Sequence, residues 1–177
     1  TGDTWGVRTN QLYSVGGVDG DYVTRPEKIR DGVWQFSTSG TMESSTAYRP
    51  IALMFHHAED RTGALDHDNY LTVRLLNDGT NDEVQLREVD GGTGSELAAT
   101  TVALTDGNRY VVRVEAIGAR IRVWVDDVQL IDYELIGQNL KFTEYSRWGF
   151  LEYTAGSPGT NANVHEVYAF EFDEPYE

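Results

Sequence analysis

The segment from Arg109 to Tyr133 constrains the fold more than any other part of the chain, because its pattern predicts three antiparallel strands joined by two tight turns. A first turn centred on Gly118-Ala119 pairs apolar residues on one face: Val112 with Val125, Val114 with Val123 and Ala116 with Ile121. On the other face Glu115 meets Arg122, and Arg113 meets Trp124. The first face is therefore predicted to line a core, and the second to carry an ion pair and a cation–π pair.

A second turn at Asp126-Asp127 continues this ladder. Its spacing predicts that Val125 lies opposite Val128 and that Val123 lies opposite Leu130.

Strand patterns recur through the rest of the chain, and no stretch has a persuasive amphipathic helical pattern. The predicted strands are Trp5–Val7, Gln11–Tyr13, Val33–Ser37, Ile51–Ala58, Tyr70–Leu76, Val84–Val89, Trp148–Tyr153 and Val164–Phe172. Turn residues separate them, as in Asn77–Asp82 and in the glycine-rich loop Gly91–Gly94. The spacing indicates an all-β protein, a two-sheet antiparallel β-sandwich. We expect a single domain over residues 1–177, with an acidic tail after about residue 172.

The amino-acid composition excludes several classes of binding partner and of functional site. The net charge of -15 repels nucleic acid and anionic membranes, and no apolar run is long enough for membrane insertion. The chain has no cysteine, which excludes disulfides, zinc–thiolate sites and cysteine nucleophiles. Only Lys28 and Lys141 are lysines. This acidic, lysine-poor composition is typical of halophilic proteins, and equally of acidic exported proteins from GC-rich genomes.

The order of the elements resembles the concanavalin A-like lectin/glucanase superfamily, in particular its laminin-G-like jelly-roll branch. Four pieces carry the resemblance: Trp5 and Val7 before a short strand ending at Leu12; Asp68-Asn69-Tyr70 through Leu86; Tyr110 through Asp126; and Gly149-Phe150-Leu151 before a polar loop and a last aromatic strand. The resemblance implies two curved sheets. Ligands would bind on the concave face or in edge loops, in some members beside a calcium ion.

The resemblance also offers an enzymatic alternative, which the residues do not support. Glycan-hydrolysing members carry carboxylates as Glu-x-Asp-x-x-Glu on one strand, because alternate residues share a face and the reaction needs two carboxylates close together. This chain lacks that run. Glu88-Val89-Asp90 is similar, but it leads directly into Gly91-Gly92 without a third carboxylate. We therefore expect no enzymatic activity and no catalytic residues.

The first candidate ligand site is Trp124 with Arg113 and Arg122, on the polar face of the central hairpin. Sugar rings stack on aromatic side chains, while arginine side chains hydrogen-bond to the hydroxyl groups of the sugar. Tyr70, Arg74 and Arg87 share the polar face of the earlier hairpin and could extend the same surface. The alternatives are that another segment packs over Trp124, and that the arginines form ordinary cross-strand pairs.

Two oxygen-rich loops are candidate calcium sites: one with Asp66, Asp68 and Asn69, the other with Asp19 and Asp21. Aspartate and asparagine also dominate plain turns, so an ordinary turn is the alternative for each loop. His56 and His57 would point to opposite faces of a strand and could not chelate one ion together.

The sequence thus favours a non-catalytic, lectin-like carbohydrate-binding module at an extracellular location or on a virion surface, such as a tail fibre. Its partner would be a cell-surface or extracellular glycan. The first alternative is a structural or assembly domain of a viral fibre, capsid decoration or surface layer, which predicts a stable homo-oligomer without a small ligand. A divergent glycan hydrolase or lyase is the second.

Overall fold

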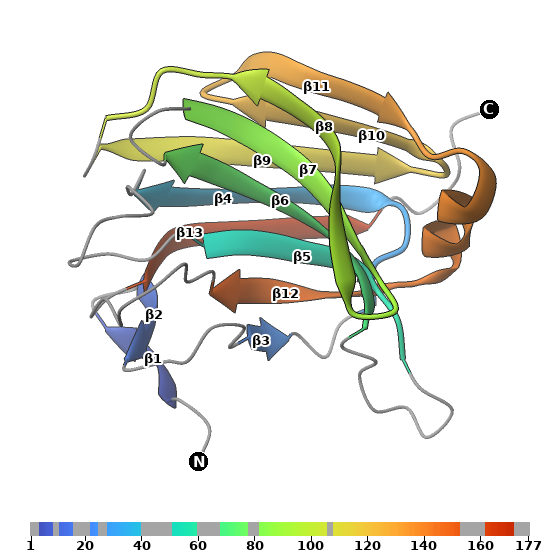
Figure 1. Ribbon diagram of the computed structural model, residues 1–177. Helices are drawn as coiled ribbons and strands as arrows, with labels where there is room; N and C mark the ends of the chain where they lie inside the picture. The colour runs from blue at the N-terminus through green and yellow to red at the C-terminus, as the bar shows by residue number, and fades with distance from the viewer. Residues whose placement is uncertain are drawn as a thin grey trace.

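The protein is a sandwich of two antiparallel sheets (Figure 1). The computed structural model describes residues 4–8, 11–15, 22–24, 28–39, 51–59, 68–77, 82–105, 108–152 and 162–171, with side chains for 28–38, 52–59, 68–76, 82–105 and 108–151. The strands are β1 (Thr4–Arg8), β2 (Gln11–Val15), β3 (Tyr22–Thr24), β4 (Gly32–Ser39), β5 (Ile51–His57), β6 (Asn69–Asn77), β7 (Asp82–Asp90), β8 (Thr93–Thr101), β9 (Arg109–Ile117), β10 (Arg120–Val125), β11 (Val128–Glu134), β12 (Arg147–Glu152) and β13 (Ala162–Glu171). One 3₁₀ helix, η1 (Gly137–Glu144), joins β11 to β12.

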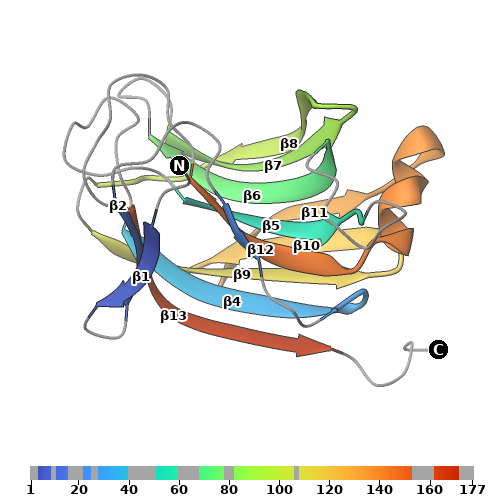
Figure 2. The same ribbon diagram turned by 90° about the horizontal axis from the view of Figure 1, so that it is seen from below.

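The strands divide between a seven-stranded and a six-stranded sheet. The seven-stranded sheet has the order β1-β2-β13-β4-β9-β10-β11, and the six-stranded sheet has the order β3-β12-β5-β6-β7-β8. Figure 2 shows the two layers, and in this view β6, β7 and β8 curve so that the outward face of the six-stranded sheet is concave. The all-β sandwich predicted from the sequence is therefore confirmed.

The central hairpins have nearly the predicted register. Every predicted β9–β10 pair is present, including Glu115 with Arg122 and Arg113 with Trp124, and Val125 pairs with Val128 as expected. The predicted pairing of Val123 with Leu130 is wrong, because a β-bulge after Val123 sets it opposite Ile131. The bulge turns Ile131 into the core, where it is 3% exposed.

Alternating apolar residues of both sheets fill the space between the layers. Leu53, Phe55, Leu71, Val73 and Leu86 come from the six-stranded sheet. Opposite them lie Trp34, Phe36, Val112, Val114, Ile121 and Val123 from the seven-stranded sheet. Trp148 and Phe150, which alternate on β12, also lie in this core. In β9 and β10 one residue in two is buried, as expected of strands with one face against a partner sheet, whereas the described side chains of β5 and those from Leu71 to Leu76 of β6 are buried on both faces.

The sandwich is closed along one side, where the edge strands β8 and β11 meet. Thr100 Oγ1 donates a hydrogen bond of 2.8 Å to the carbonyl oxygen of Leu130, the residue at the bulge in β11. This bond links the two sheets directly. In the described part of the chain, no helix is long and apolar enough to cross a membrane.

Candidate functional site

Trp124 lies on the outward face of the seven-stranded sheet, between Arg113 on β9 and Gln129 on β11. The guanidinium carbon of Arg113 is 3.9 Å from the centre of the indole ring, so the predicted cation–π pair is present. Trp124 is half-buried. Because the guanidinium covers one face of the ring, a sugar could stack there only by displacing it.

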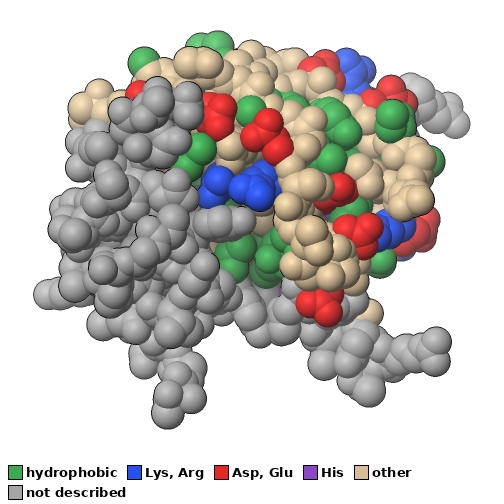
Figure 3. Space-filling view, viewed as in Figure 1, with side chains coloured by type: hydrophobic (Ala, Val, Ile, Leu, Met, Phe, Trp, Pro, Cys, Tyr) green, Lys and Arg blue, Asp and Glu red, His purple; other side chains and the backbone are tan. Residues whose placement is uncertain are grey.

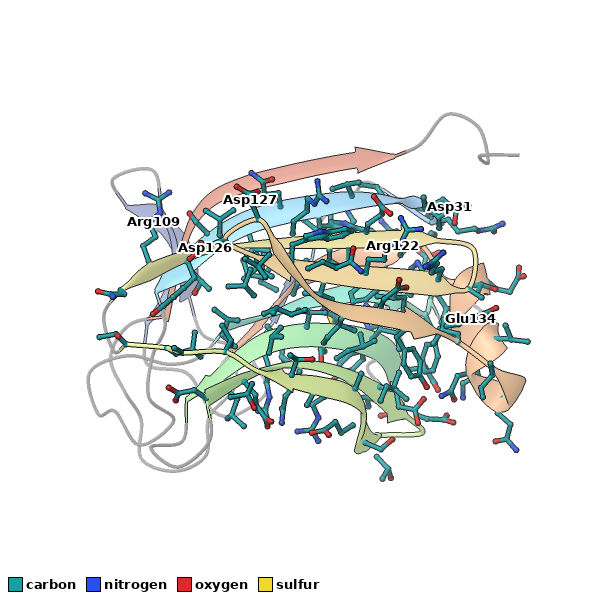
Figure 4. All side chains as sticks on the ribbon, turned by 90° about the horizontal axis from the view of Figure 1, so that it is seen from above. Asp31, Arg109, Arg122, Asp126, Asp127 and Glu134 are labelled. Atoms are coloured by element: carbon teal, nitrogen blue, oxygen red, sulfur yellow. The ribbon has the colours of Figure 1, made fainter. Side chains whose placement is uncertain are left out.

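Ion pairs cover the surface around Trp124. Arg122 Nη1 lies 2.5 Å from Glu115 Oε1, as the sequence predicted. Arg120 donates two bonds to the carboxylate of Asp132, of 2.8 and 2.7 Å, and these bonds hold the pKa of Asp132 below its ordinary value. Figure 4 shows Arg122 on β10 of this sheet. The arginines beside Trp124 are therefore already bound to protein groups.

The prediction that Tyr70, Arg74 and Arg87 extend the Trp124 surface is wrong. These three residues lie on β6 and β7 of the six-stranded sheet, whereas Trp124 lies on β10 of the seven-stranded sheet. The two sheets pack through their apolar faces, so their polar faces point away from each other. The six predicted residues therefore form two groups of three on opposite sides of the molecule.

The outward face of the six-stranded sheet carries a continuous hydrogen-bonded group across three strands. Arg74 Nε on β6 donates to Gln85 Oε1 on β7 over 2.7 Å. Gln85 Nε2 donates to Glu83 Oε1 over 2.5 Å and to Glu96 Oε2 on β8 over 3.0 Å. Arg87 lies directly opposite Glu96 in the ladder. We call these five residues the β6–β8 polar array.

Burial differs across the polar array. Arg74 and Gln85 are each only 5% exposed although they lie on an outward face, Glu83 and Arg87 are half-buried, and Glu96 is exposed. Figure 3 views this side of the molecule and shows basic side chains next to acidic ones. The array therefore has a buried base and a more exposed rim, from which charged groups can reach a bound molecule.

Small side chains make room for Arg74. Its neighbours in the same row are Ala52 on β5 and Gln85 on β7, and Ala99 lies beyond Gln85 on β8. A long guanidinium side chain can therefore lie flat across the sheet and reach the amide of Gln85. In the next row Met54, Thr72 and Arg87 follow one another across β5, β6 and β7.

Sequence reasoning missed Glu83, Gln85 and Glu96 as site residues. Glu83 and Gln85 alternate with Arg87, so the signal for a shared polar face was present in the sequence. Glu96 had no such signal, because Gly91–Gly94 was predicted to be a loop and β8 was not predicted.

Of the predicted calcium ligands, Asp68 and Asn69 belong to the described residues, and Asp66, Asp19 and Asp21 lie outside them. Asn69 Oδ1 accepts a 3.3 Å bond from Gly91 N, and the carbonyl of Asp68 accepts a 3.0 Å bond from Gly92 N. These bonds hold the β7–β8 turn against the start of β6. In the described part of the chain, no group of three or more carboxylate or imidazole side chains is placed so that it could hold a metal ion.

His56 and His57 are both fully buried and contact different neighbours. His56 packs edge-on against Trp34 in the core, at 6.3 Å between ring centres, and His57 packs against Tyr70 on β6 at 5.4 Å. His56 has a left-handed backbone, with φ at 46°, and its Nε2 lies 2.8 Å from the carbonyl oxygen of Arg30. Burial lowers its pKa to about 4, so the imidazole is neutral at pH 7 and Nε2–H donates that bond.

Comparison with known proteins gives a likeness of fold. No family model and no curated sequence matches the chain. A carbohydrate-binding module, CBM66, from Bacillus subtilis is similar in structure, with a TM-score of 0.71 at 17% identity over 94% of this chain and 91% of that chain. The exoplasmic/lumenal domain of VIP36, in its Ca²⁺/Man-bound form, gives 0.67 at 12% identity over 99% of this chain and 83% of that one. A xylan β-1,4-xylosidase from Bacillus halodurans gives 0.66 at 11% identity over 93% of this chain but only 33% of the enzyme chain.

These likenesses agree with the resemblance read from the sequence. The fold is a jelly-roll β-sandwich, similar to that of the carbohydrate-binding module and of the VIP36 domain. Structures similar to this chain include a carbohydrate-binding module, a toad ovary galectin and a glycosidic hydrolase.

Proposed function

We propose that this chain is a non-catalytic glycan-binding module of an exported or virion-surface protein, and that the glycan binds the concave face of the six-stranded sheet over the β6–β8 polar array. The observation that carries the proposal is the array itself. It combines guanidinium donors and carboxylate acceptors on one outward face. A guanidinium donates a hydrogen bond to one sugar hydroxyl group, and a carboxylate accepts one from a neighbouring hydroxyl group. Half-buried Tyr70 adds an aromatic ring on β6.

Two observations favour this face over the Trp124 face. The guanidinium of Arg113 already covers one side of Trp124, where a sugar ring would have to stack. The polar array also lies on a concave surface (Figure 2), which can surround more of a ligand than a flat one.

The non-catalytic part of the proposal rests on the sequence, which lacks the Glu-x-Asp-x-x-Glu run. Glu83 and Glu96 lie on different strands, and each accepts a hydrogen bond from the amide nitrogen of Gln85. In the proposal they hold hydroxyl groups of the glycan.

The first test is binding of mannose-, galactose- and xylose-based oligosaccharides, measured by calorimetry. We expect Arg87→Ala to weaken binding of the best oligosaccharide about 10- to 100-fold, since a hydrogen bond from a charged donor contributes about 1.5–3 kcal/mol. Arg122→Ala on the opposite sheet is the matched control and should bind as the wild type does. Equal loss in both variants, or loss in Arg122→Ala alone, would contradict this placement of the site.

Two further measurements distinguish the proposed function from the hydrolase and from the structural or assembly domain. Release of new reducing ends from any oligosaccharide would identify a hydrolase. Absence of binding together with a stable oligomer in size-exclusion chromatography with light scattering would favour the structural or assembly domain.

Calcium remains a prediction attached to this proposal. Asp68 and Asn69 alone offer too few oxygen atoms for an ion that takes six to eight ligands. The titrations are therefore run with added calcium and again with a chelator. Binding that disappears with the chelator supports an ion near Asp66, Asp68 and Asn69, or near Asp19 and Asp21.

A second prediction concerns Trp124. We expect Trp124→Ala to leave glycan affinity unchanged and to lower the free energy of unfolding by about 1–2 kcal/mol, because it removes a half-buried ring and its contact with Arg113. Urea denaturation and the same titrations measure the two effects. Loss of binding with unchanged stability would instead move the ligand to the seven-stranded sheet, as the sequence alone suggested.

A further inference from the structure

Gln85 is the one residue that joins the two charged halves of the β6–β8 polar array. Its side chain is 5% exposed, and its amide bonds Arg74 through the oxygen and both Glu83 and Glu96 through the nitrogen. A glutamine amide offers one acceptor oxygen and two N–H donors. Both donors are therefore used on carboxylates, and the oxygen is used on the guanidinium.

An amide is the side chain that this position requires. A glutamate there could accept from Arg74 but could not donate to two carboxylates, and a lysine could donate but could not accept. Without a donor between them, two carboxylates held side by side would repel each other, most strongly where burial limits solvent screening. Gln85 thus keeps Glu83 and Glu96 together.

From this arrangement we infer that Gln85 is a positioning residue, which sets two carboxylates next to each other as a paired acceptor for two neighbouring hydroxyl groups of an uncharged glycan. The inference rests on the glycan-binding function proposed above and specifies its ligand. Glu96 is exposed and Glu83 is half-buried, so both can meet a ligand while Gln85 lies beneath them.

The charge of the site selects between classes of glycan. A uronate or sulfate group placed over the paired carboxylates would meet like charge, within a molecule of net charge -15. Hydroxyl groups have no such penalty and can donate to both carboxylates, while half-buried Arg87 can donate to a ring or hydroxyl oxygen.

The test compares Gln85→Glu and Gln85→Met with the wild type, using the mannose-, galactose- and xylose-based oligosaccharides at pH 7 and pH 5. We expect both variants to bind at least about tenfold more weakly at pH 7, because each loses one or more hydrogen bonds between residue 85 and a charged group. Gln85→Glu should regain affinity severalfold at pH 5. Its new carboxyl group lies beside the like charges of Glu83 and Glu96, so it can bind a proton at that pH and donate a hydrogen bond, as the amide does in the wild type. Gln85→Met cannot donate at either pH and should regain nothing. Gln35→Glu, on the outward face of the other sheet, is the charge control and should bind as the wild type does.

The outcomes show separately whether Gln85 positions the carboxylates and whether the protein binds a glycan. Wild-type affinity in Gln85→Glu at pH 7, or equal recovery of both variants at pH 5, would overturn the positioning role. A wild type that prefers a uronate-containing oligosaccharide of equal length would overturn the uncharged ligand but keep the function. If the wild type binds none of the sugars, the proposed function fails.

The nuclear magnetic resonance signals of the Gln85 amide test the positioning role independently of any ligand or variant. Slow exchange of both amide protons with water supports it, and rapid exchange contradicts it.

Discussion

Acidification from pH 7 to pH 4 is expected to lower the free energy of unfolding by about 3 kcal/mol through His56 alone. The pKa of His56 falls from an ordinary 6.5 to about 4 in the folded protein, first of all because burial removes the imidazolium from water. Between these values the unfolded chain binds a proton that the folded chain does not bind. The stability that His56 contributes is therefore complete above pH 6.5 and is lost progressively as the pH falls to 4.

The surroundings of His56 explain why the ring resists protonation. Trp34 and Phe55 pack against it at 6.3 and 5.2 Å between ring centres. The carbonyl of Arg30 and the charge of Asp31 raise the pKa, and the charge of Arg30 lowers it, but burial outweighs them. A charged imidazole at this position would be surrounded by apolar groups.

Urea denaturation at pH 4, 5, 6 and 7 measures the effect. The matched variant is His56→Asn, since asparagine tolerates the left-handed backbone and does not titrate in this range. We expect this variant to be less stable than the wild type at pH 7 and to lose about 3 kcal/mol less on acidification. Equal pH dependence in the two proteins would show that His56 is not the titrating group.

Replacement of Trp34 by alanine is expected to lower the free energy of unfolding by about 3–5 kcal/mol, the largest effect of any single substitution considered for this protein. Trp34 is 1% exposed and lies between the sheets, with its ring centre 5.4 Å from that of Phe55. Truncation removes the transfer free energy of the indole and leaves a cavity that two rigid sheets cannot close.

Trp34→Phe provides the control for this prediction. In the described part of the structure, the indole N–H of Trp34 has no hydrogen-bond acceptor. Phenylalanine removes that buried donor and leaves a smaller cavity, so we expect a loss of about 1–2 kcal/mol. Thermal and urea unfolding compare the two variants. Similar losses in both would mean that the indole N–H stabilises the fold through a bonded group, such as a buried water.

The central hairpins could be predicted from the sequence because local chemistry fixes them. Alternation of valine with charged residues sets the faces of β9 and β10, and the turn at Gly118-Ala119 sets their register. The bulge after Val123 could not be predicted in this way. An ideal ladder would direct Leu130 inward, and the choice of Ile131 depends on the space left by the opposite sheet.

The candidate site was harder to predict because it depends on the assignment of strands to sheets. The polar faces of β6 and β10 have similar patterns, and no local signal says that they point in opposite directions. Strand β8 has mostly exposed side chains and therefore little of the apolar alternation that marks a strand. Without β8, Glu96 could not be placed beside Gln85. Helix η1 was missed for a related reason, since Phe142 is its one buried residue.

The bond between Thr100 and Leu130 has a consequence for contacts between copies of the protein. The outer strand of an open sheet can capture a strand of another molecule, and crowding promotes such fibre-forming contacts. The carbonyl of Leu130 already accepts a hydrogen bond from the opposite sheet, and the bulge at this residue interrupts the flat row of groups that a foreign strand would need. The β8–β11 side of the sandwich is therefore protected from pairing with a strand of another molecule, whereas β1 and β3 are the outer strands on its other side.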